Sequence, residues 1–292
     1  MTAKQQDPAF ILTYGQSGTG KTLDQMRAFP NGLFIADQGA TRGAINLLGF
    51  APRTGKAASI AVAAEMMKKH ATPGSAVILD DFSLLAERTV FQLSESKKGH
   101  DLWGEVRNQT LRLRIAAREL NCHVIINAHE AAPVTDRVRG WMPGGPYFQG
   151  SARHDLPKAC DIVWRAVRCD ARLSWPYGYQ SHNSDASYIT KDRLGVTSDL
   201  SPMNMGELLR AGGFDIQRRA AWAWHEEYVE KIAVKLLPLT EVDERRKFLV
   251  AVKEQIQKKK TVTDAELRWV FADALDRADI RRTLINPLAS ML

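Results

Sequence analysis

The segment Gly15-Gln16-Ser17-Gly18-Thr19-Gly20-Lys21-Thr22 has the spacing Gly-x-x-x-x-Gly-Lys-Thr. After a strand and at the start of a helix, this pattern cradles the phosphates of a nucleoside triphosphate. The glycines let successive backbone amides point at phosphate oxygens, and the helix N-terminus adds partial positive charge. We expect Lys21 to bridge the β- and γ-phosphates and Thr22 to offer its hydroxyl to Mg²⁺. The alternative, a chance glycine-rich turn, is disfavoured because a strand-like apolar run, residues 10–14, comes directly before it.

The second part of such a site is a carboxylate at the end of another strand. Residues 76–79 are apolar and are followed by Asp80 and Asp81. We expect Asp80 to lie beside Thr22 and to hold Mg²⁺ through water, because carboxylate oxygens suit this hard cation. Asp81 is the alternative for the same role. A plain turn aspartate at a strand end is the structural alternative for Asp80.

Hydrolysis also needs a group that polarises the attacking water. In RecA-like ATPases this carboxylate follows the second strand, where this chain has Asp37, although the usual residue there is the longer Glu. Glu130 is the other candidate. The preceding residue, His129, lies at the tip of the fourth predicted strand and is placed to sense the γ-phosphate. A half-buried histidine without such a role is the alternative.

Two cations near residue 190 are candidates for action on a neighbouring subunit. Lys191 and Arg193 are two positions apart, so on a strand their side chains share one face. Both would then address one γ-phosphate in trans, as an arginine finger does. This interpretation predicts a homo-oligomer, either a ring or a filament. The alternative is a solvated basic turn.

Residues 131–157 look like a long loop, rich in glycine and proline, after the fourth predicted strand. Loops of this length inside a compact domain are usually functional or disordered. Arginines for phosphates alternate here with aromatic rings for base stacking, and the candidates are Arg137, Arg139, Trp141, Tyr147, Phe148 and Arg153. We therefore predict binding of single-stranded DNA. The alternatives are a small satellite core made by these rings, and DNA contacts near Lys258-Lys259-Lys260.

The elements that must position these residues alternate along the chain. Short apolar runs at 10–14, 33–36, 76–79, 123–128 and from 161 onward are separated by helical patterns. This alternation predicts an α/β fold with a central, mostly parallel sheet covered by helices. After residue 214 the pattern changes, and residues 220–237, 241–258 and 264–275 look helical. We expect an ATPase domain over 1–214 and a small helical region over 215–292.

The composition of the chain indicates which partners and locations to expect. The 292 residues carry a net charge of +7, with 45% hydrophobic and 25% charged residues. A basic excess suits a polyanionic partner such as nucleic acid. No apolar run approaches the roughly 20 residues that span a bilayer, and the N-terminus lacks a signal-peptide pattern. The three cysteines fit neither a zinc site nor a redox pair. We expect no membrane partner and a cytoplasmic location.

Taken together, four motifs resemble a known family. They are the phosphate loop, Leu79-Asp80-Asp81, Ala128-His129-Glu130 and Thr190-Lys191-Asp192-Arg193-Leu194-Gly195, followed by Asn204-Met205-Gly206-Glu207-Leu208-Leu209. Over about residues 8–214 the chain resembles the phage RecA-like P-loop ATPases of the Sak group, in the AAA/RecA superfamily. The resemblance implies a RecA-like core, ATP and Mg²⁺ as cofactors, and DNA-dependent hydrolysis by an oligomer in recombination or replication, in the host cytoplasm.

Two other functions compete with this interpretation. One is a nucleotide-switched assembly or packaging protein with little ATPase activity, which the Asp at position 37 and the unassigned C-terminal helices favour. The other is a small-molecule kinase, which is disfavoured because such kinases usually have an arginine-rich lid and a phosphate-loop strand directly beside the aspartate strand.

Overall fold

A computed structural model gives the fold. It describes residues 7–36, 41–48, 51–137, 140–150, 152–169, 177–182, 186–214, 216 and 223–259, with four helical residues beyond them, Leu267, Val270, Phe271 and Ala274. The chain divides into two compact units. The first holds Met1–Gly43, Ala51–Arg168 and Tyr177–Gln217, and the second holds Ala44–Phe50, Cys169–Pro176 and Arg218–Leu292. The predicted division at 214/215 lies near the end of the first unit's last segment and stays a prediction.

The first unit is built on one large sheet. Its strands are β1 (Phe10–Gly15), β2 (Leu33–Ile35), β3 (Arg53–Gly55), β4 (Ala76–Leu79), β5 (His123–Ala128), β10 (Ile162–Arg168), β11 (Tyr177–Gln180), β12 (Lys191–Asp192) and β13 (Leu200–Pro202). They lie in the order β13-β11-β10-β1-β5-β4-β2-β3, and β12 pairs with β10. The strands from β10 to β3 run parallel, whereas β11, β12 and β13 join antiparallel.

The position of β5 identifies the type of sheet. β5 lies between the phosphate-loop strand β1 and the Asp80 strand β4, which is the arrangement expected of RecA-like rather than kinase-like P-loop folds. The predicted α/β class with a central, mostly parallel sheet and a RecA-like core is confirmed. The carboxyl ends of the parallel strands lie at one edge of the sheet, so the segments after β1, β4 and β5 converge there.

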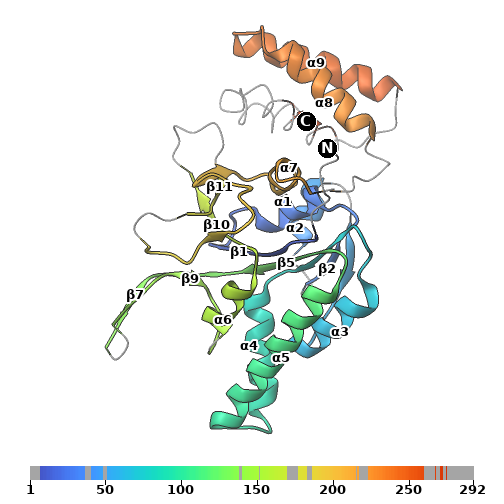
Figure 1. The fold of residues 1–292 in the computed structure, drawn as a ribbon. Helices are drawn as coiled ribbons and strands as arrows, with labels where there is room; N and C mark the ends of the chain where they lie inside the picture. The colour runs from blue at the N-terminus through green and yellow to red at the C-terminus, as the bar shows by residue number, and fades with distance from the viewer. Residues whose placement is uncertain are drawn as a thin grey trace, which may run out of the picture. The chain divides into compact units, whose positions relative to one another are not determined.

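Helices cover both faces of this sheet (Figure 1). On one face lie α3 (Ile60–His70), α4 (Phe82–Ser94), α5 (Gly99–Glu119) and α6 (Ala152–Ala159), and on the other lie α1 (Lys21–Ala28) and α7 (Met205–Ala211). A further helix, α2 (Arg42–Leu48), follows β2. Helix α4 was not anticipated from the sequence. It begins directly after Asp81, whose carboxylate caps it by accepting from the amide of Leu84 at 3.1 Å.

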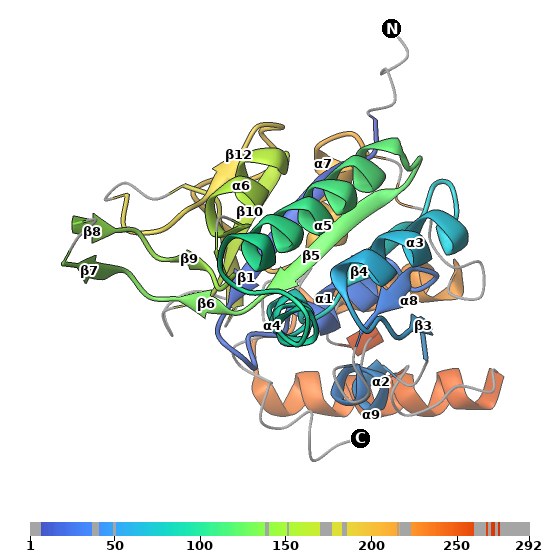
Figure 2. The same cartoon turned by 90° about the horizontal axis from the view of Figure 1, so that it is seen from below.

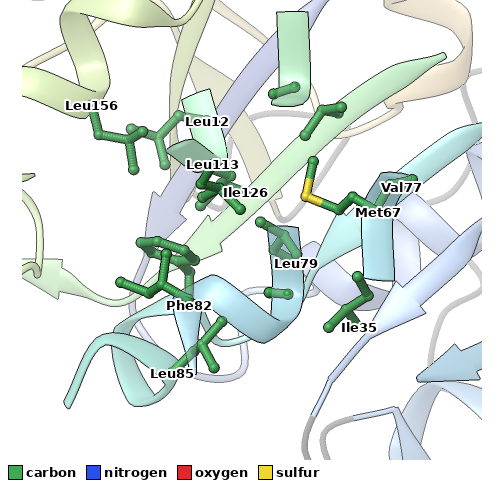
Figure 3. Close-up of a cluster of buried hydrophobic side chains, with 14 of the residues drawn as sticks. Leu12, Ile35, Met67, Val77, Leu79, Phe82, Leu85, Leu113, Ile126 and Leu156 are labelled. Atoms are coloured by element: carbon green, nitrogen blue, oxygen red, sulfur yellow. The ribbon is translucent and has the colours of Figure 1, made fainter. Parts of the chain in front are cut away.

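Alternation along the strands divides the side chains between the two faces. Phe10, Leu12 and Tyr14 of β1 belong to the main core, with side chains of β2, β4 and β5 and of helices α3 to α6. Figure 3 shows part of this core, where the labelled Leu12 and Leu79 of the sheet lie among Phe82, Leu113 and Leu156 of the covering helices. The opposite face of β1 carries Thr13, which is buried against α1. One face of β1 therefore packs in the apolar core, and the other face contacts the phosphate-loop helix α1.

The prediction of a long loop over 131–157 is wrong. Strands β7 (Val134–Asp136) and β8 (Gly140–Met142) form an antiparallel hairpin, and β6 (Glu130–Ala131) pairs with β9 (Gly145–Pro146) at its root. The hairpin projects from the first unit in both views (Figures 1 and 2). Pairing between the two legs satisfies backbone groups that an extended loop would leave to water.

The second unit has its own small core. Helices α8 (Ala223–Leu236) and α9 (Val242–Lys259) match the helical pattern of the sequence. Their buried side chains form a cluster with Leu267, Val270, Phe271 and Ala274. None of the helices in the described part of the chain is long and apolar enough to cross a membrane.

Candidate nucleotide-binding site

The phosphate loop joins β1 to α1 at the carboxyl edge of the sheet. Gly18 and Gly20 adopt positive φ angles of 79° and 86°, a conformation that disfavours any side chain. The Lys21 ammonium donates to the carbonyls of Gly15 and Gln16, both at 3.0 Å, and to Thr19 Oγ1 at 3.3 Å. Burial lowers the pKa of Lys21. The lysine is thus folded over the loop, close to where phosphate oxygens would compete for it.

Thr22 and Asp80 are brought together as the sequence predicts. Thr22 Oγ1 donates to Asp80 at 3.0 Å from Oδ2 and 3.2 Å from Oδ1. Asp80 is 8% exposed, and burial raises its pKa, although hydrogen bonds from Asn127 and Thr22 oppose this. A hydroxyl and a buried carboxylate side by side fit a hard cation, which would favour the ionised carboxylate.

No group of three or more metal-ligating His, Cys, Asp or Glu side chains occurs among the described residues. Mg²⁺ held by Thr22 and Asp80 would therefore complete its coordination with phosphate oxygens and water, which is how this ion is usually bound.

A buried polar network supports Asp80 from beneath. Asn127 Nδ2 donates to Asp80 Oδ1 at 2.9 Å and to Gln25 Oε1 at 2.6 Å. Gln25 Nε2 donates in turn to Asn127 Oδ1 at 2.6 Å and to Thr13 at 3.0 Å, and Thr13 donates to Asn127. Sequence reasoning missed Gln25 and Asn127. The available signal was an asparagine inside an apolar strand, since a buried amide needs partners.

His129 contacts Asp81, the residue after the proposed metal ligand. Its Nε2 lies 3.2 Å from Asp81 Oδ2, and its backbone amide donates to Ser83 Oγ at 3.0 Å. Asp81 has a left-handed backbone, with φ of 55°. Because one oxygen of Asp81 faces His129 and the other caps α4, Asp81 is less available than Asp80 for a metal ion.

Of the two candidate catalytic carboxylates, Asp37 lies outside the described residues. Glu130 accepts from Arg165 Nε at 2.8 Å and from Nη2 at 3.0 Å. The Glu130 side chain is 9% exposed. Arg165 lies beside Tyr14 across the β1–β10 pairing, so this ion pair is close to the start of the phosphate loop. Glu130 is thus near the site, and both of its oxygens are engaged.

Lys191 and Arg193 lie away from the phosphate loop of their own chain. In the register, Gly15 faces Ala166 of β10, whereas Lys191 pairs with Val163, toward the other end of that strand. Lys191 Nζ donates to the carbonyls of Pro157 at 2.6 Å and Lys158 at 3.2 Å. Arg193 is exposed. Strand β12 ends at Asp192, and the Arg193 amide still donates to the carbonyl of Asp161 at 3.1 Å. Lys191 binds the end of α6, and joint action of the two cations on one phosphate stays a prediction.

The predicted DNA-binding residues lie in different environments. Trp141 and Tyr147 are 54% and 40% exposed, and Arg137 is exposed. Phe148 is 6% exposed and packs edge-to-face on Phe82 at 5.3 Å, so the prediction that its ring stacks on a base is wrong for this conformation. Two further members of the set, Arg153 and Arg139, differ again: Arg153 donates to the carbonyl of Pro143 at 2.7 Å, and Arg139 lies outside the described residues.

Comparisons with known proteins assign no family to this chain. No protein-family model matches the chain, and no curated protein sequence matches it. Among solved structures, the chain is similar to the RadB recombinase, with 13% sequence identity and a TM-score of 0.39, over 61% of this chain and 83% of that one. The comparisons do not reach the phage Sak group, which remains a resemblance drawn from the sequence.

Proposed function

We propose that this protein binds ATP with Mg²⁺ and hydrolyses it. The observation that carries the proposal is the contact of Thr22 with Asp80 at the edge where the phosphate loop and Lys21 also lie. A threonine hydroxyl, a strand-end carboxylate and a loop lysine are the parts that P-loop ATPases use to hold a metal–triphosphate.

Each residue has a defined task in this proposal. Lys21 leaves the loop carbonyls and neutralises the β- and γ-phosphates, while the loop amides and the start of α1 hold their oxygens. Thr22 holds Mg²⁺ directly and Asp80 holds it through water, with Asn127 orienting the carboxylate. When bound, Mg²⁺ would supply positive charge that stabilises the charge developing on the phosphates. Glu130 and Asp37 are the candidates for orienting water.

We further propose that single-stranded DNA stimulates turnover and that the protein acts as an oligomer in recombination or replication, in the host cytoplasm if phage-encoded. Support for DNA binding is the projecting β7–β8 hairpin, which presents Arg137 and the exposed Trp141. Support for an oligomer is Arg193, an exposed cation remote from its own phosphate loop.

One observation favours a second function, a nucleotide-switched assembly or packaging protein with little turnover. Two hydrogen bonds from Arg165 occupy the Glu130 carboxylate, so Glu130 cannot orient a water molecule unless the ion pair opens. Such a protein would bind ATP with the same loop but release phosphate slowly, with or without DNA.

The experiment that tests the proposal is steady-state phosphate release with and without oligo-dT, together with calorimetric ATP binding. Lys21→Ala should lose ATP binding and turnover, whereas Lys69→Ala, which removes an exposed lysine from the end of α3, should retain both. Wild-type ATP binding by Lys21→Ala would refute the site. Tight ATP binding by the wild type with no turnover would favour the second function.

A further inference from the structure

Arg165 makes more contacts than an ion pair requires. Besides its two bonds to Glu130, its Nη1 donates to Gln180 Oε1 at 3.2 Å. Its guanidinium carbon also lies 3.4 Å from the centroid of the Tyr188 ring. The Arg165 side chain is 20% exposed and that of Glu130 is 9% exposed. Planar arginine side chains suit such combined bidentate and stacked sites, where lysine does not replace them.

Two of the three partners of Arg165, Glu130 and Tyr188, are connected to the root of the projecting hairpin. Glu130 lies in β6, opposite Pro146 of β9. On the other side, the segment around Tyr188 pairs with Gly144, whose amide donates to the carbonyl of Ser187 at 2.7 Å and whose carbonyl accepts from Ile189 at 2.9 Å. The chain entering the hairpin therefore contacts this guanidinium through Glu130, and the chain leaving the hairpin is connected to it through Tyr188.

The same guanidinium is close to the proposed hydrolytic centre. Arg165 pairs with Tyr14, the residue before the phosphate loop, and the Tyr14 hydroxyl donates to the carbonyl of Ile189 at 2.8 Å. Glu130 follows Asn127, which holds Asp80, by three positions. A displacement of the hairpin root therefore reaches the Glu130 carboxylate through a short, packed connection.

We propose that the Arg165–Glu130 ion pair couples the β7–β8 hairpin to the hydrolytic site: it holds the Glu130 carboxylate while the hairpin is empty, and a single strand bound to the hairpin loosens that hold. This inference rests on the proposed function, since it names the regulation of the same site. Arg165 acts through Glu130 and is a positioning residue. Glu130 becomes free to orient water only when the root of the hairpin shifts.

Phosphate release by Arg165→Gln, with and without oligo-dT, tests the coupling. Coupling between two sites commonly amounts to about 5- to 150-fold. We expect the DNA-free rate of Arg165→Gln to rise and its ratio of stimulated to unstimulated rate to fall at least about fivefold relative to the wild type. Arg168→Gln, which removes an exposed arginine from the end of the same strand, should keep the wild-type ratio.

Two further variants separate coupling from simple damage. Arg165→Lys keeps the charge but loses the bidentate geometry, so its ratio should fall between those of the wild type and Arg165→Gln. In a Glu130→Gln background, Arg165→Gln should change the nucleotide dependence of oligo-dT affinity no further, because its partner has already been neutralised.

Binding provides a readout independent of turnover and covers the case in which Arg165→Gln fails to fold. Coupling of binding is reciprocal, so a non-hydrolysable ATP analogue should change the affinity of the wild type for oligo-dT. Glu130→Gln, which keeps the shape of the side chain, should lose that change. The inference is overturned if Glu130→Gln keeps the full nucleotide dependence, or if folded Arg165→Gln keeps the wild-type ratio.

Failure of the proposed function gives a different result. A wild-type protein whose turnover ignores oligo-dT, or equals that of Lys21→Ala, removes the premise and the inference with it. If oligo-dT stimulates the wild type and Arg165→Gln to the same extent, the coupling is overturned but the proposed function is not.

Discussion

Thr22 Oγ1 lies 3.0 Å from Asp80 Oδ2, although the two residues are 58 positions apart in the chain. The contact spans β5, which lies between β1 and β4, because the start of the phosphate-loop helix and the end of β4 converge at the same edge of the sheet. A hydroxyl from one element and a carboxylate from another thus meet at the edge of the sheet.

Asn127→Ala should weaken Mg²⁺-dependent ATP binding about 10- to 100-fold, which is the usual effect of removing a group that orients a metal ligand. Asn127 donates to the Asp80 carboxylate and to Gln25, so the variant leaves both without that partner. Calorimetric titration of ATP at several Mg²⁺ concentrations measures the effect. Unchanged Mg²⁺ dependence would contradict the role of Asn127 in orienting the Asp80 carboxylate. Asn108→Ala, on the exposed side of α5, is the control.

Arg193→Ala should bind ATP normally and lose about 10³-fold or more in turnover, the effect of removing an arginine finger. Mixing it with Asp80→Ala should restore part of the activity, because each subunit supplies what the other lacks. A protein that stays monomeric at micromolar concentration with ATP bound would contradict the trans arrangement. Lys191→Ala should instead lower thermal stability, because Lys191 binds the carbonyls of Pro157 and Lys158.

Trp141→Ala should weaken oligo-dT binding by about 1–3 kcal/mol, the usual value of one stacked base. Arg137→Ala should reduce the slope of log affinity against log salt by about one. Fluorescence anisotropy of labelled oligo-dT at several salt concentrations measures both. If neither variant differs from the wild type, the DNA contacts lie elsewhere, and the Lys258 region becomes the first candidate.

Phe148→Ala is the comparison for Trp141→Ala, because the Phe148 ring is buried against Phe82. It should destabilise the fold by about 3–5 kcal/mol, as large-to-small core substitutions do. Urea unfolding monitored by circular dichroism measures this loss. A Phe148→Ala protein of normal stability that has lost only DNA affinity would restore the original sequence-based interpretation of this ring.

His123 should make the fold acid-sensitive between about pH 6.5 and pH 4. Burial lowers the pKa of His123 from 6.5 to about 4, and its Nδ1 accepts from the amide of Ala9 at 3.1 Å. In this window the unfolded chain binds a proton that the folded chain does not. The free energy of unfolding therefore falls as pH falls, by up to about 3 kcal/mol for this group.

Urea unfolding at several pH values, compared between the wild type and His123→Gln, isolates this contribution from that of the carboxylates. The variant should lose less stability on acidification, whereas His100→Gln, at an exposed position of α5, should follow the wild type. Equal pH dependence of all three proteins would contradict a neutral, buried His123.

Local pattern was enough to predict the phosphate loop and the strand ending at Asp80. A glycine-rich turn, a lysine and an apolar run leave few structural options, so their positions follow from short stretches of sequence. The α/β class follows in the same way from alternating apolar runs and helical patterns. These features depend on neighbours in the chain, which a single sequence displays directly.

Side-chain contacts that depend on pairing between strands far apart in the chain could not be predicted from the sequence. Gln25 and Asn127 meet only because β1 and β5 are neighbours, and Glu130 meets Arg165 only through the position of β10. Phe148 illustrates the same limit, since an aromatic residue between glycines fits a loop tip as well as a core. Its burial depends on α4, a helix that the sequence pattern did not reveal.

The position of β1 within the sheet constrains the order in which the chain can mature during synthesis. β1 holds the phosphate loop, yet both of its neighbours, β5 and β10, come from much later in the sequence. A nascent chain released only as far as residue 122 would carry the entire Gly-Lys-Thr motif on a strand without partners. Domains emerge from the ribosome from the N-terminus at about 5–20 residues per second, so the first motif to be translated waits several seconds for its support.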